Sequence, residues 1–238
     1  MQSRVKSKPA GRYPDTYVII PVYNEAQVII KVVEDVLGKF QNVVCVNDGS
    51  KDDTADQIAK TDATLVNHPI NLGQGAALQT GIDYALMDPA AKYFVTFDAD
   101  GQHRLEDVLK MLKYIKSNNV DAVLGSRFLG RAENITVFKR AILKAAILFS
   151  NLTSGIKLTD AHNGLRVFNR KFAENLRLTM PDMAHASEIV HRVAEGGYSY
   201  KELPVTIRYT DYSMQKGQSA LNAVNLSFDL LLHRMSKK

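Results

Sequence analysis

Two carboxylates, Asp98 and Asp100, stand one residue apart at the end of an apolar, β-forming run, and the turn residue Gly101 follows them. A buried parallel strand delivers such side chains to the carboxyl edge of its sheet, where open α/β folds bind ligands. Hard divalent cations such as Mg²⁺ take oxygen ligands there. The pattern indicates a metal that holds phosphate groups. Acidic turns after strands are also common without a metal, so this segment alone leaves both interpretations open.

Polar residues also follow the first two apolar runs of the chain. Residues 21–25 read Pro-Val-Tyr-Asn-Glu, and residues 46–54 read Val-Asn-Asp-Gly-Ser-Lys-Asp-Asp-Thr. At a carboxyl edge, one ligand could lie across both segments. Asp48 could accept hydrogen bonds from a base and Glu25 from ribose hydroxyls, because ionised carboxylates are acceptors only. The segments predict a nucleotide pocket, whereas Asp53 is expected to cap the next helix.

A glycine-containing segment, residues 71–77, opens a helix after the third apolar run and reads Asn-Leu-Gly-Gln-Gly-Ala-Ala. Gly73 and Gly75 permit close backbone approach, and free amides at a helix start favour an anionic group. The Gly-Lys-Ser/Thr ending of a Walker loop is absent. We therefore expect both glycines at the cofactor-binding edge, in a loop of a different type.

The elements that must position these residues alternate between strands and helices. Strands are expected over residues 17–22, 43–46, 63–67, 93–97 and 122–125, and helices over residues 25–40, 54–60, 76–86 and 106–116. Strand–helix–strand units are parallel and right-handed. The sequence therefore predicts an α/β fold with a doubly wound, mostly parallel sheet and helices on both faces, as a single domain over residues 15–219.

The rhythm changes after residue 127. Helices are expected over residues 138–152 and 186–195 and a strand over residues 203–208, while residues 1–14 form a flexible lead-in and residues 220–238 a C-terminal amphipathic helix. The first and last of these helices mix aliphatic and basic residues. That composition suits a helix packed on the core or one lying at a membrane surface.

Composition narrows the class of protein. The chain has 238 residues, of which 45% are hydrophobic and 23% charged, which is typical of a globular domain with a large core. Its single cysteine, Cys45, excludes a disulfide within the chain and favours a cytoplasmic setting. No apolar run approaches the ~20 residues of a membrane span. The net charge of +5 favours anionic partners, but its dispersal disfavours nucleic acid.

Taken in order, these segments resemble the family-2 glycosyltransferases of the GT-A fold, nearest to the dolichol-phosphate mannose synthase-like, polyprenyl-phosphate branch. The resemblance runs from Val18 to about Ser219 and adds Gly-Ser-Arg, Asp-Ala-His-Asn-Gly-Leu-Arg-Val-Phe and Glu-Leu-Pro-Val to the motifs above. It implies a nucleotide-diphosphate sugar donor, Mg²⁺ or Mn²⁺, and inversion at the anomeric carbon. The metal ligands that it implies are Asp98, Asp100 and Gln102. The nucleoside contacts that it implies are Pro21, Tyr23, Glu25 and Asp48.

Cationic side chains have a part in such a reaction. Negative charge grows on the diphosphate as the glycosidic bond breaks, and a metal ion with cationic side chains stabilises it. Arg127, after the fifth expected strand, and Arg208, after Leu-Pro-Val-Thr-Ile, are candidates because guanidinium groups bind phosphate oxygens bidentately. Structural salt bridges are the alternative for both.

The acceptor decides whether a base is needed. A polyprenyl phosphate brings its own nucleophilic oxygen, so Arg140 and Arg166 could position it without a base. A sugar hydroxyl, as in the extension of a surface polysaccharide, requires a carboxylate such as Asp160 or Glu188. The alternatives are that Asp160 organises a loop and that Glu188 is an exposed helix residue. A lipid-linked acceptor implies work at the cytoplasmic face of the membrane, through peripheral contact or a membrane-protein partner.

Some residues depart from the family pattern. Asn47 stands where an acidic residue is usual, and His162 where a small residue or cysteine is frequent. Residues 209–219 are longer than the usual short version, and we expect either a mobile loop over donor and acceptor or an ordinary surface loop. One rival function is that of a nucleotidyltransferase, but this chain lacks the triphosphate-binding loop expected of that class. The other is that of a non-catalytic nucleotide-binding module.

Overall fold

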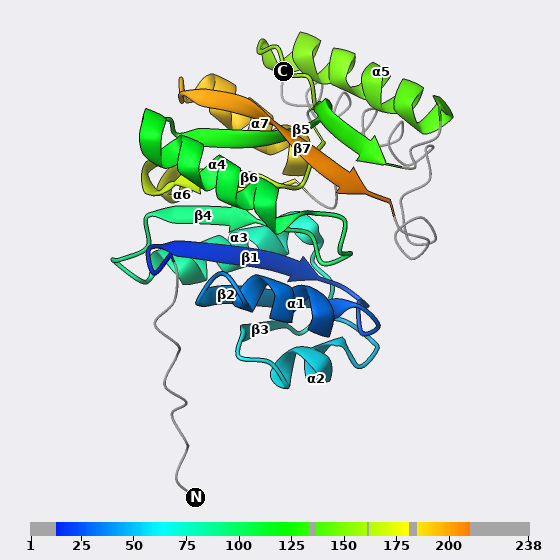
Figure 1. Cartoon of the computed structure of the whole chain (residues 1–238), viewed down its shortest axis with the longest axis vertical. Helices are drawn as coiled ribbons and strands as arrows, with labels where there is room; N and C mark the ends of the chain where they lie inside the picture. Colours follow the sequence, from blue (N-terminus) through cyan, green and yellow to red (C-terminus); the bar gives the residue numbers. More distant parts are fainter. Residues whose placement is uncertain (1–12, 134–136, 161, 181–184, 210–238) are drawn as a thin grey trace, which may run out of the picture.

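A computed structural model describes residues 13–133, 137–160, 162–180 and 185–209. They form a seven-stranded sheet in the order β3-β2-β1-β4-β6-β5-β7 (Figure 1). The strands are β1 Thr16–Val22, β2 Asn42–Asp48, β3 Thr64–His68, β4 Tyr93–Thr96, β5 Ala122–Glu133, β6 Arg166–Asn169 and β7 Tyr200–Arg208. The helices are α1 Ile29–Leu37, α2 Thr54–Ala59, α3 Gln74–Leu86, α4 Leu105–Asn118, α5 Val137–Ser154, α6 Arg170–Asn175 and α7 His185–Glu195.

The sheet is parallel except at β6, which runs antiparallel to both of its neighbours, β4 and β5. The predicted α/β fold with a mostly parallel sheet is confirmed. Neither β6 nor α6 was expected, because both are short and β6 contains a buried arginine. β5 is also much longer than expected: it continues to Glu133 and follows β7 through a register shift between Ser126 and Arg131.

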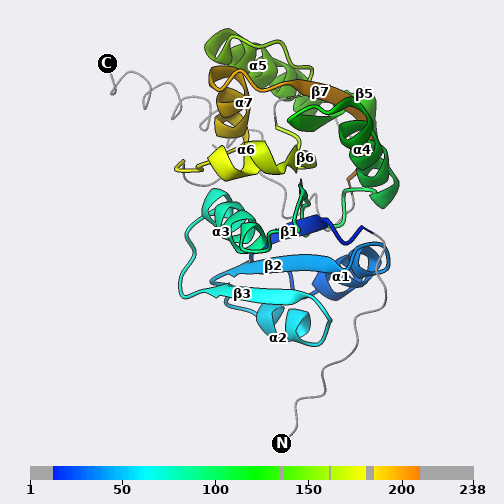
Figure 2. The same cartoon turned by 90° about the vertical axis from the view of Figure 1, so that its left-hand side faces the viewer.

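Helices cover both faces of the sheet (Figure 2). Residues of α1, α2 and α4 pack in one apolar cluster, and residues of α3, α5, α6 and α7 pack in another. Neighbouring residues of β1 divide between the clusters, with Val18 and Ile20 on one side and Ile19 on the other, because successive side chains of a strand point to opposite faces. The core therefore lies in two layers that hold the sheet rigid.

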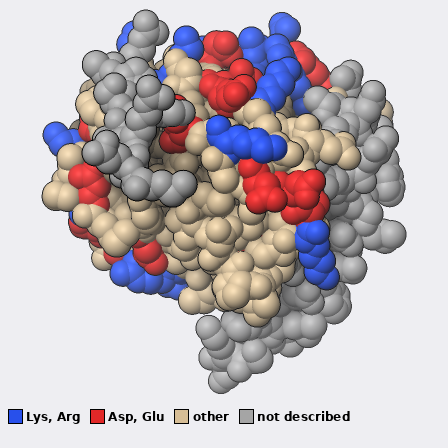
Figure 3. Space-filling model, turned by 90° about the horizontal axis from the view of Figure 1, so that it is seen from below, with Lys and Arg blue, Asp and Glu red and all other residues tan. Residues whose placement is uncertain are grey.

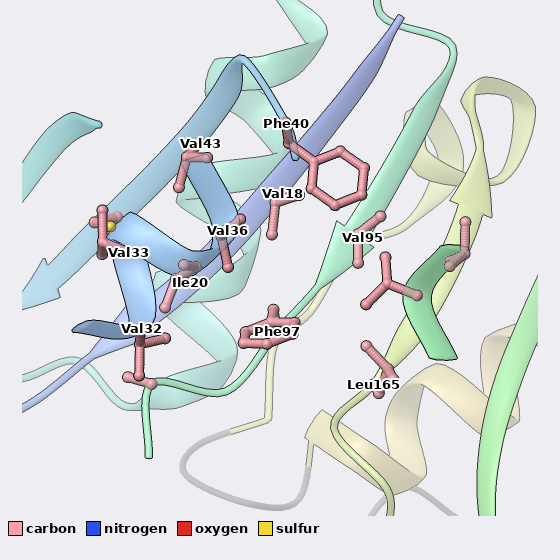
Figure 4. Packing of buried hydrophobic residues seen from close by; sticks show 14 of the residues in the cluster. Val18, Ile20, Val32, Val33, Val36, Phe40, Val43, Val95, Phe97 and Leu165 are labelled. Carbon is pink, nitrogen blue, oxygen red and sulfur yellow. The ribbon is translucent and has the colours of Figure 1, made fainter. Parts of the chain in front are cut away.

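Phe97 anchors the chain immediately before the acidic pair. Its side chain is buried in the same apolar cluster as Ile20 and Val32 and lies beside them in Figure 4. Its amide donates to the Ile19 carbonyl at 3.0 Å, which extends the pairing of the chain with β1 beyond the last residue of β4. Since Phe97 is fixed by backbone and core together, Asp98 leaves the sheet from a defined point.

Several expectations fall at element ends or outside the described residues. The helix expected from residue 25 begins at Ile29. The helix expected over residues 138–152 is present as α5, and that expected over residues 186–195 as α7. Most of the lead-in over residues 1–14, the tail after residue 209 and the helix over residues 220–238 lie outside the described part. No helix within the described ranges joins enough length to enough apolarity to cross a bilayer.

Charge and thiol chemistry are ordinary away from the site. Acidic and basic side chains are interspersed on the face of the molecule seen in Figure 3, so that face presents mixed charge. Cys45 is fully buried in β2, and burial raises the pKa of its thiol to about 12. Because the thiolate is the reactive form, Cys45 acts here as a small core residue.

Candidate active site

Asp98 lies at the carboxyl edge of the sheet and is held from three sides. His103 Nε2 lies 2.8 Å from Asp98 Oδ2, and Gln74 Nε2, at the start of α3, donates to Oδ1 at 3.2 Å. A Cβ at residue 164 would overlap the carboxylate, so Gly164 lets the strand-β6 loop pack directly against it. The Asp98 side chain nevertheless keeps 29% of its surface exposed. The carboxylate is thus oriented by the protein and open to a ligand.

The two acidic residues carry opposite pKa shifts. Burial raises the pKa of Asp98, but His103, His185 and Arg166 outweigh burial and hold it below its ordinary value. Burial, and then the charge of Asp98, raise the pKa of Asp100 to about 6, against the opposing effect of His103. The protein therefore stabilises the ionised form of Asp98 and disfavours that of Asp100.

A divalent cation fits this donor set. Carboxylate oxygens of Asp98 and Asp100 are the ligands that Mg²⁺ and Mn²⁺ prefer, and the cation's charge would oppose the burial and the charge of Asp98 that together raise the pKa of Asp100. Gln102 lies against Asp100, donating to its oxygens from Nε2 at 2.7 Å and from the backbone amide at 3.0 Å. Within the described residues no three His, Cys, Asp or Glu side chains form a complete ligand set. Phosphate oxygens of a substrate would have to complete the shell, as is usual for Mg²⁺.

The loops after β1 and β2 are tied together beside this pair. Asn24, in the left-handed region at φ 52°, accepts from the Lys51 amide at 2.8 Å, and its own amide donates to Ser50 Oγ at 2.9 Å. The next amide, that of Glu25, donates to Thr54 Oγ1 at 2.8 Å. Such cross-links fix the path of the segment that follows β1.

This arrangement brings some of the expected nucleoside residues to the edge. Glu25 is close enough to Asp100 to raise its pKa further. Tyr23, in the same loop, is exposed, whereas Pro21 is buried within β1. The structure therefore brings Glu25 close to Asp100, while Tyr23 lies exposed in the same loop and Pro21 is buried within β1.

Asp48 is engaged by protein groups. Its side chain is buried and accepts from the amides of Leu72 and Gly73 at 2.9 and 2.8 Å and contacts His68 Nδ1 at 2.8 Å. Asp48 therefore closes the turn that leads into α3. Contact with a base stays a prediction, and these partners leave it less room than the sequence suggested.

The glycines before and within α3 serve the backbone. Gly73 has φ 92°, which favours glycine, and its amide donates to Asp48. The Gly73 amide is thus engaged by Asp48, and contact of Gly73 with a cofactor stays a prediction. A Cβ at Gly75 would lie 2.9 Å from both His185 Cβ and the Met180 carbonyl oxygen. Gly75 thus allows α3 and the start of α7 to approach closely.

Arg127 and Asp160 form a buried ion pair. Arg127 Nε lies 2.6 Å from Asp160 Oδ2, and the exposed fractions of the two side chains are 10% and 0%. The Arg127 backbone amide donates to the same oxygen at 3.0 Å, and Nη1 of the Arg127 side chain donates to Tyr209 Oη at 2.8 Å. Burial lowers the pKa of Arg127, but Asp160 and Tyr209 raise it by more, so the guanidinium stays charged. Asp160 organises this loop, as one of the two sequence interpretations proposed.

The other three candidate arginines differ in exposure. Arg166 in β6 is buried; burial lowers its pKa to about 10 while Asp98 and Asp160 oppose the shift, which places its charge near both acids. Arg208 is largely exposed, with Nε 3.6 Å from Glu133 Oε2, and its backbone amide donates to the Gln102 carbonyl at 3.1 Å. Arg140 lies exposed on α5.

Glu188 holds the segment before α7. The interpretation of Glu188 as an exposed helix residue is wrong, because the side chain is buried. Its carboxylate accepts from the Thr179 amide and hydroxyl and from the Met180 amide, each at 2.9 Å through the shorter contact. Both oxygens are thus occupied by the backbone segment that they organise.

Three residues that orient or stabilise the Asp98 carboxylate were not identified from the sequence. Gln74, His103 and His185 all act on Asp98, by hydrogen bond or by charge. His103 directly follows the Gly-Gln turn, which is the one signal that could have singled it out. A lone sequence does not show whether such a ring turns inward.

His162 should make the free energy of unfolding depend on pH. Burial lowers its pKa to about 4, with Arg127 and Arg166 adding to the shift and Asp160 opposing it. Because the folded state disfavours the protonated ring, this group's contribution to stability is present above about pH 6.5 and is lost as the pH falls toward 4. We expect His162→Gln to flatten the fall in unfolding free energy over that window, measured by urea denaturation.

The matched control is His191→Gln, which alters a half-buried histidine on α7 that pairs with Glu195. This variant should keep the wild-type slope between pH 6.5 and 4. An unchanged slope in the His162 variant would contradict the prediction.

The fold is shared with solved glycosyltransferase structures. Glucosyl-3-phosphoglycerate synthase from Mycobacterium tuberculosis, in complex with Mn²⁺ and uridine-diphosphate-glucose, aligns over 96% of this chain and 80% of its own, with a TM-score of 0.63 and 16% identity. This likeness defines a GT-A-like α/β fold.

Sequence comparison gives the family. The family model described as glycosyl transferase family 2 matches residues 17–177. The UDP-N-acetylglucosamine–dolichyl-phosphate N-acetylglucosaminyltransferase of Methanococcus voltae is 29% identical, covering 93% of this chain and 96% of its own. Polyprenol monophosphomannose synthase of Mycolicibacterium smegmatis is 28% identical, covering 84% and 80%. The chain belongs to glycosyl transferase family 2 and is a glycosyltransferase.

Proposed function

We propose that this enzyme transfers a hexose from a nucleotide-diphosphate sugar to a polyprenyl-type lipid phosphate, with Mg²⁺ or Mn²⁺ and with inversion. The relatives named for dolichyl-phosphate and polyprenol substrates support the acceptor class. The observation that favours a phosphate acceptor over a hydroxyl acceptor is that both candidate bases are already engaged by protein groups. Asp160 forms an ion pair with Arg127, and the Glu188 carboxylate accepts hydrogen bonds from backbone amides. A phosphate acceptor is already anionic and needs neither as a base.

The residues divide the work by position. Asp98 and Asp100, with Gln102 beside them, would hold the metal, which when bound supplies Lewis-acid stabilisation of the leaving diphosphate. Glu25 and Tyr23, in the loop after β1, would contact the nucleoside. Arg166 supplies positive charge near Asp98, and Arg127 supplies positive charge beside Asp160 and near Arg166.

The chemistry balances without proton transfer. An oxygen of the acceptor phosphate forms a bond to the anomeric carbon as the bond from that carbon to the diphosphate breaks. The electron pair of the broken bond leaves with the nucleoside diphosphate. Because the charge on that leaving group grows during the step, oriented cations stabilise the transition state more than the bound substrate.

A lipid acceptor places the enzyme at the cytoplasmic face of the membrane, by surface contact or through a membrane-protein partner. α5 supports surface contact: Val137 and Leu148 are 87% and 63% exposed, and Arg140 and Lys144 are exposed as well. Their spacing puts the four on one stripe of the helix. Exposed aliphatic and basic side chains together suit an anionic lipid surface.

The test is a transfer assay with a panel of UDP-, GDP- and dTDP-sugars, run with and without a short polyprenyl phosphate and with Mn²⁺ or EDTA. We expect nucleoside diphosphate release that depends on both lipid phosphate and metal. Release that requires a sugar hydroxyl acceptor instead would replace this proposal with polysaccharide extension. Binding of donor without transfer to either acceptor would contradict both.

A further inference from the structure

The Asp98 carboxylate has two different oxygen environments. Oδ2 faces His103 Nε2 at 2.8 Å, a strong contact with a side chain that is only 2% exposed. Oδ1 receives a longer contact of 3.2 Å from the Gln74 amide, which is partly exposed. The protein thus fixes one oxygen firmly and holds the other weakly.

The His103 ring is itself locked. It packs edge-on against Phe97, with ring centroids 5.3 Å apart and planes at 66°. Its Nδ1 is buried and has no hydrogen-bond partner among the described atoms, so the bond to Asp98 is the polar contact that the ring makes there. Since a carboxylate oxygen only accepts, Nε2 carries the proton. Phe97, fixed in the core, therefore orients His103, and His103 orients Asp98.

We propose that His103 is a positioning residue for the metal site: by donating to Oδ2 it stops rotation of the Asp98 carboxylate and presents Oδ1 to the cation. Partners that orient a metal ligand commonly contribute about 10- to 100-fold in metal affinity. Gln74 completes the device, because it joins the same carboxylate to the start of α3, whose turn is set by Asp48. This inference rests on the proposed role of Asp98 as a metal ligand.

The test measures Mn²⁺ affinity by electron paramagnetic resonance on the full chain, without donor or acceptor. His103→Phe keeps an aromatic ring against Phe97 but removes the donor, and we expect the dissociation constant to rise about 10- to 100-fold. His103→Gln retains an amide donor and should stay within about threefold of wild type. His191→Phe, on α7, is the matched control and should match wild type.

Thermal unfolding of the metal-free variants separates positioning from folding. The inference requires that His103→Phe loses affinity with its unfolding midpoint near that of His103→Gln. It is overturned if His103→Phe binds Mn²⁺ as wild type does, or if the two variants lose affinity equally. Should His103→Phe not fold, His103→Leu takes its place in the same comparison.

Asp98→Asn distinguishes a failure of the proposed metal site from a failure of the positioning role of His103. If Asp98→Asn loses Mn²⁺ binding while His103→Phe keeps it, the positioning role fails and the metal site stands. If Asp98→Asn binds Mn²⁺ like wild type, the proposed metal site fails, and the role of His103 fails with it.

Discussion

Asp98→Asn should lower kcat/KM for glycosyl transfer about 10³-fold while the protein stays folded. Asparagine has the shape of aspartate, and its one oxygen can accept from His103. In that orientation the amide nitrogen takes the place of Oδ1, where it can neither bind a cation nor contribute negative charge. The loss therefore falls on the stabilisation of the leaving diphosphate.

The measurement is steady-state kinetics over a range of Mn²⁺ concentrations, with circular dichroism as the check on folding. Asp83→Asn is the control: Asp83 is exposed on α3 and contacts Gln79 of the same helix. That variant should keep wild-type kinetics. Activity of Asp98→Asn within a few-fold of wild type, at any metal concentration, would exclude Asp98 from the reaction as proposed.

The position of the acidic pair could be predicted because it depends on local pattern. Residues 93–97 are apolar β-formers, and a buried strand must end where its polar residues begin. The same reasoning located the segments after β1 and β2 at one edge, and the structure ties them there. Parallel strands put their carboxyl ends together, so topology followed from the alternation of elements.

The partners of each carboxylate could not be predicted, because they come from distant parts of the chain. Asp48 meets a turn 25 residues away, and Asp160 meets an arginine 33 residues away. β6 was missed for a related reason: its four residues form a strand by pairing with β4 and β5, which come from earlier parts of the chain. Arg166, which the sequence offered as a cation for the acceptor phosphate, is buried in β6 with its charge near Asp98 and Asp160.

Breaking the Arg127–Asp160 pair should cost stability and activity together. Asp160→Asn leaves the Arg127 guanidinium buried without the carboxylate that it pairs with, and Arg127→Met leaves the buried Asp160 carboxylate with Arg166 as the remaining nearby positive charge. Removing one partner of a buried ion pair commonly costs about 3 kcal/mol or more. We therefore expect each single variant to lose about that much unfolding free energy in urea denaturation. Tyr209→Phe removes the hydroxyl that accepts from Arg127 Nη1 and should cost about 1 kcal/mol.

The double variant Arg127→Met/Asp160→Asn separates positioning from base catalysis. It removes both charges and retains an oxygen at residue 160 for the backbone amide of residue 127, so it should cost less than the sum of the single variants, by about 1–3 kcal/mol. Transfer to a lipid phosphate should stay low in the double variant. The guanidinium charge is gone, although part of the lost stability is recovered. Asp160→Asn alone should retain part of the activity, because Arg127 is still present. If Asp160→Asn instead abolishes transfer while its stability stays near wild type, Asp160 acts on the acceptor directly, and the hydroxyl-acceptor chemistry with Asp160 as base replaces the phosphate-acceptor mechanism.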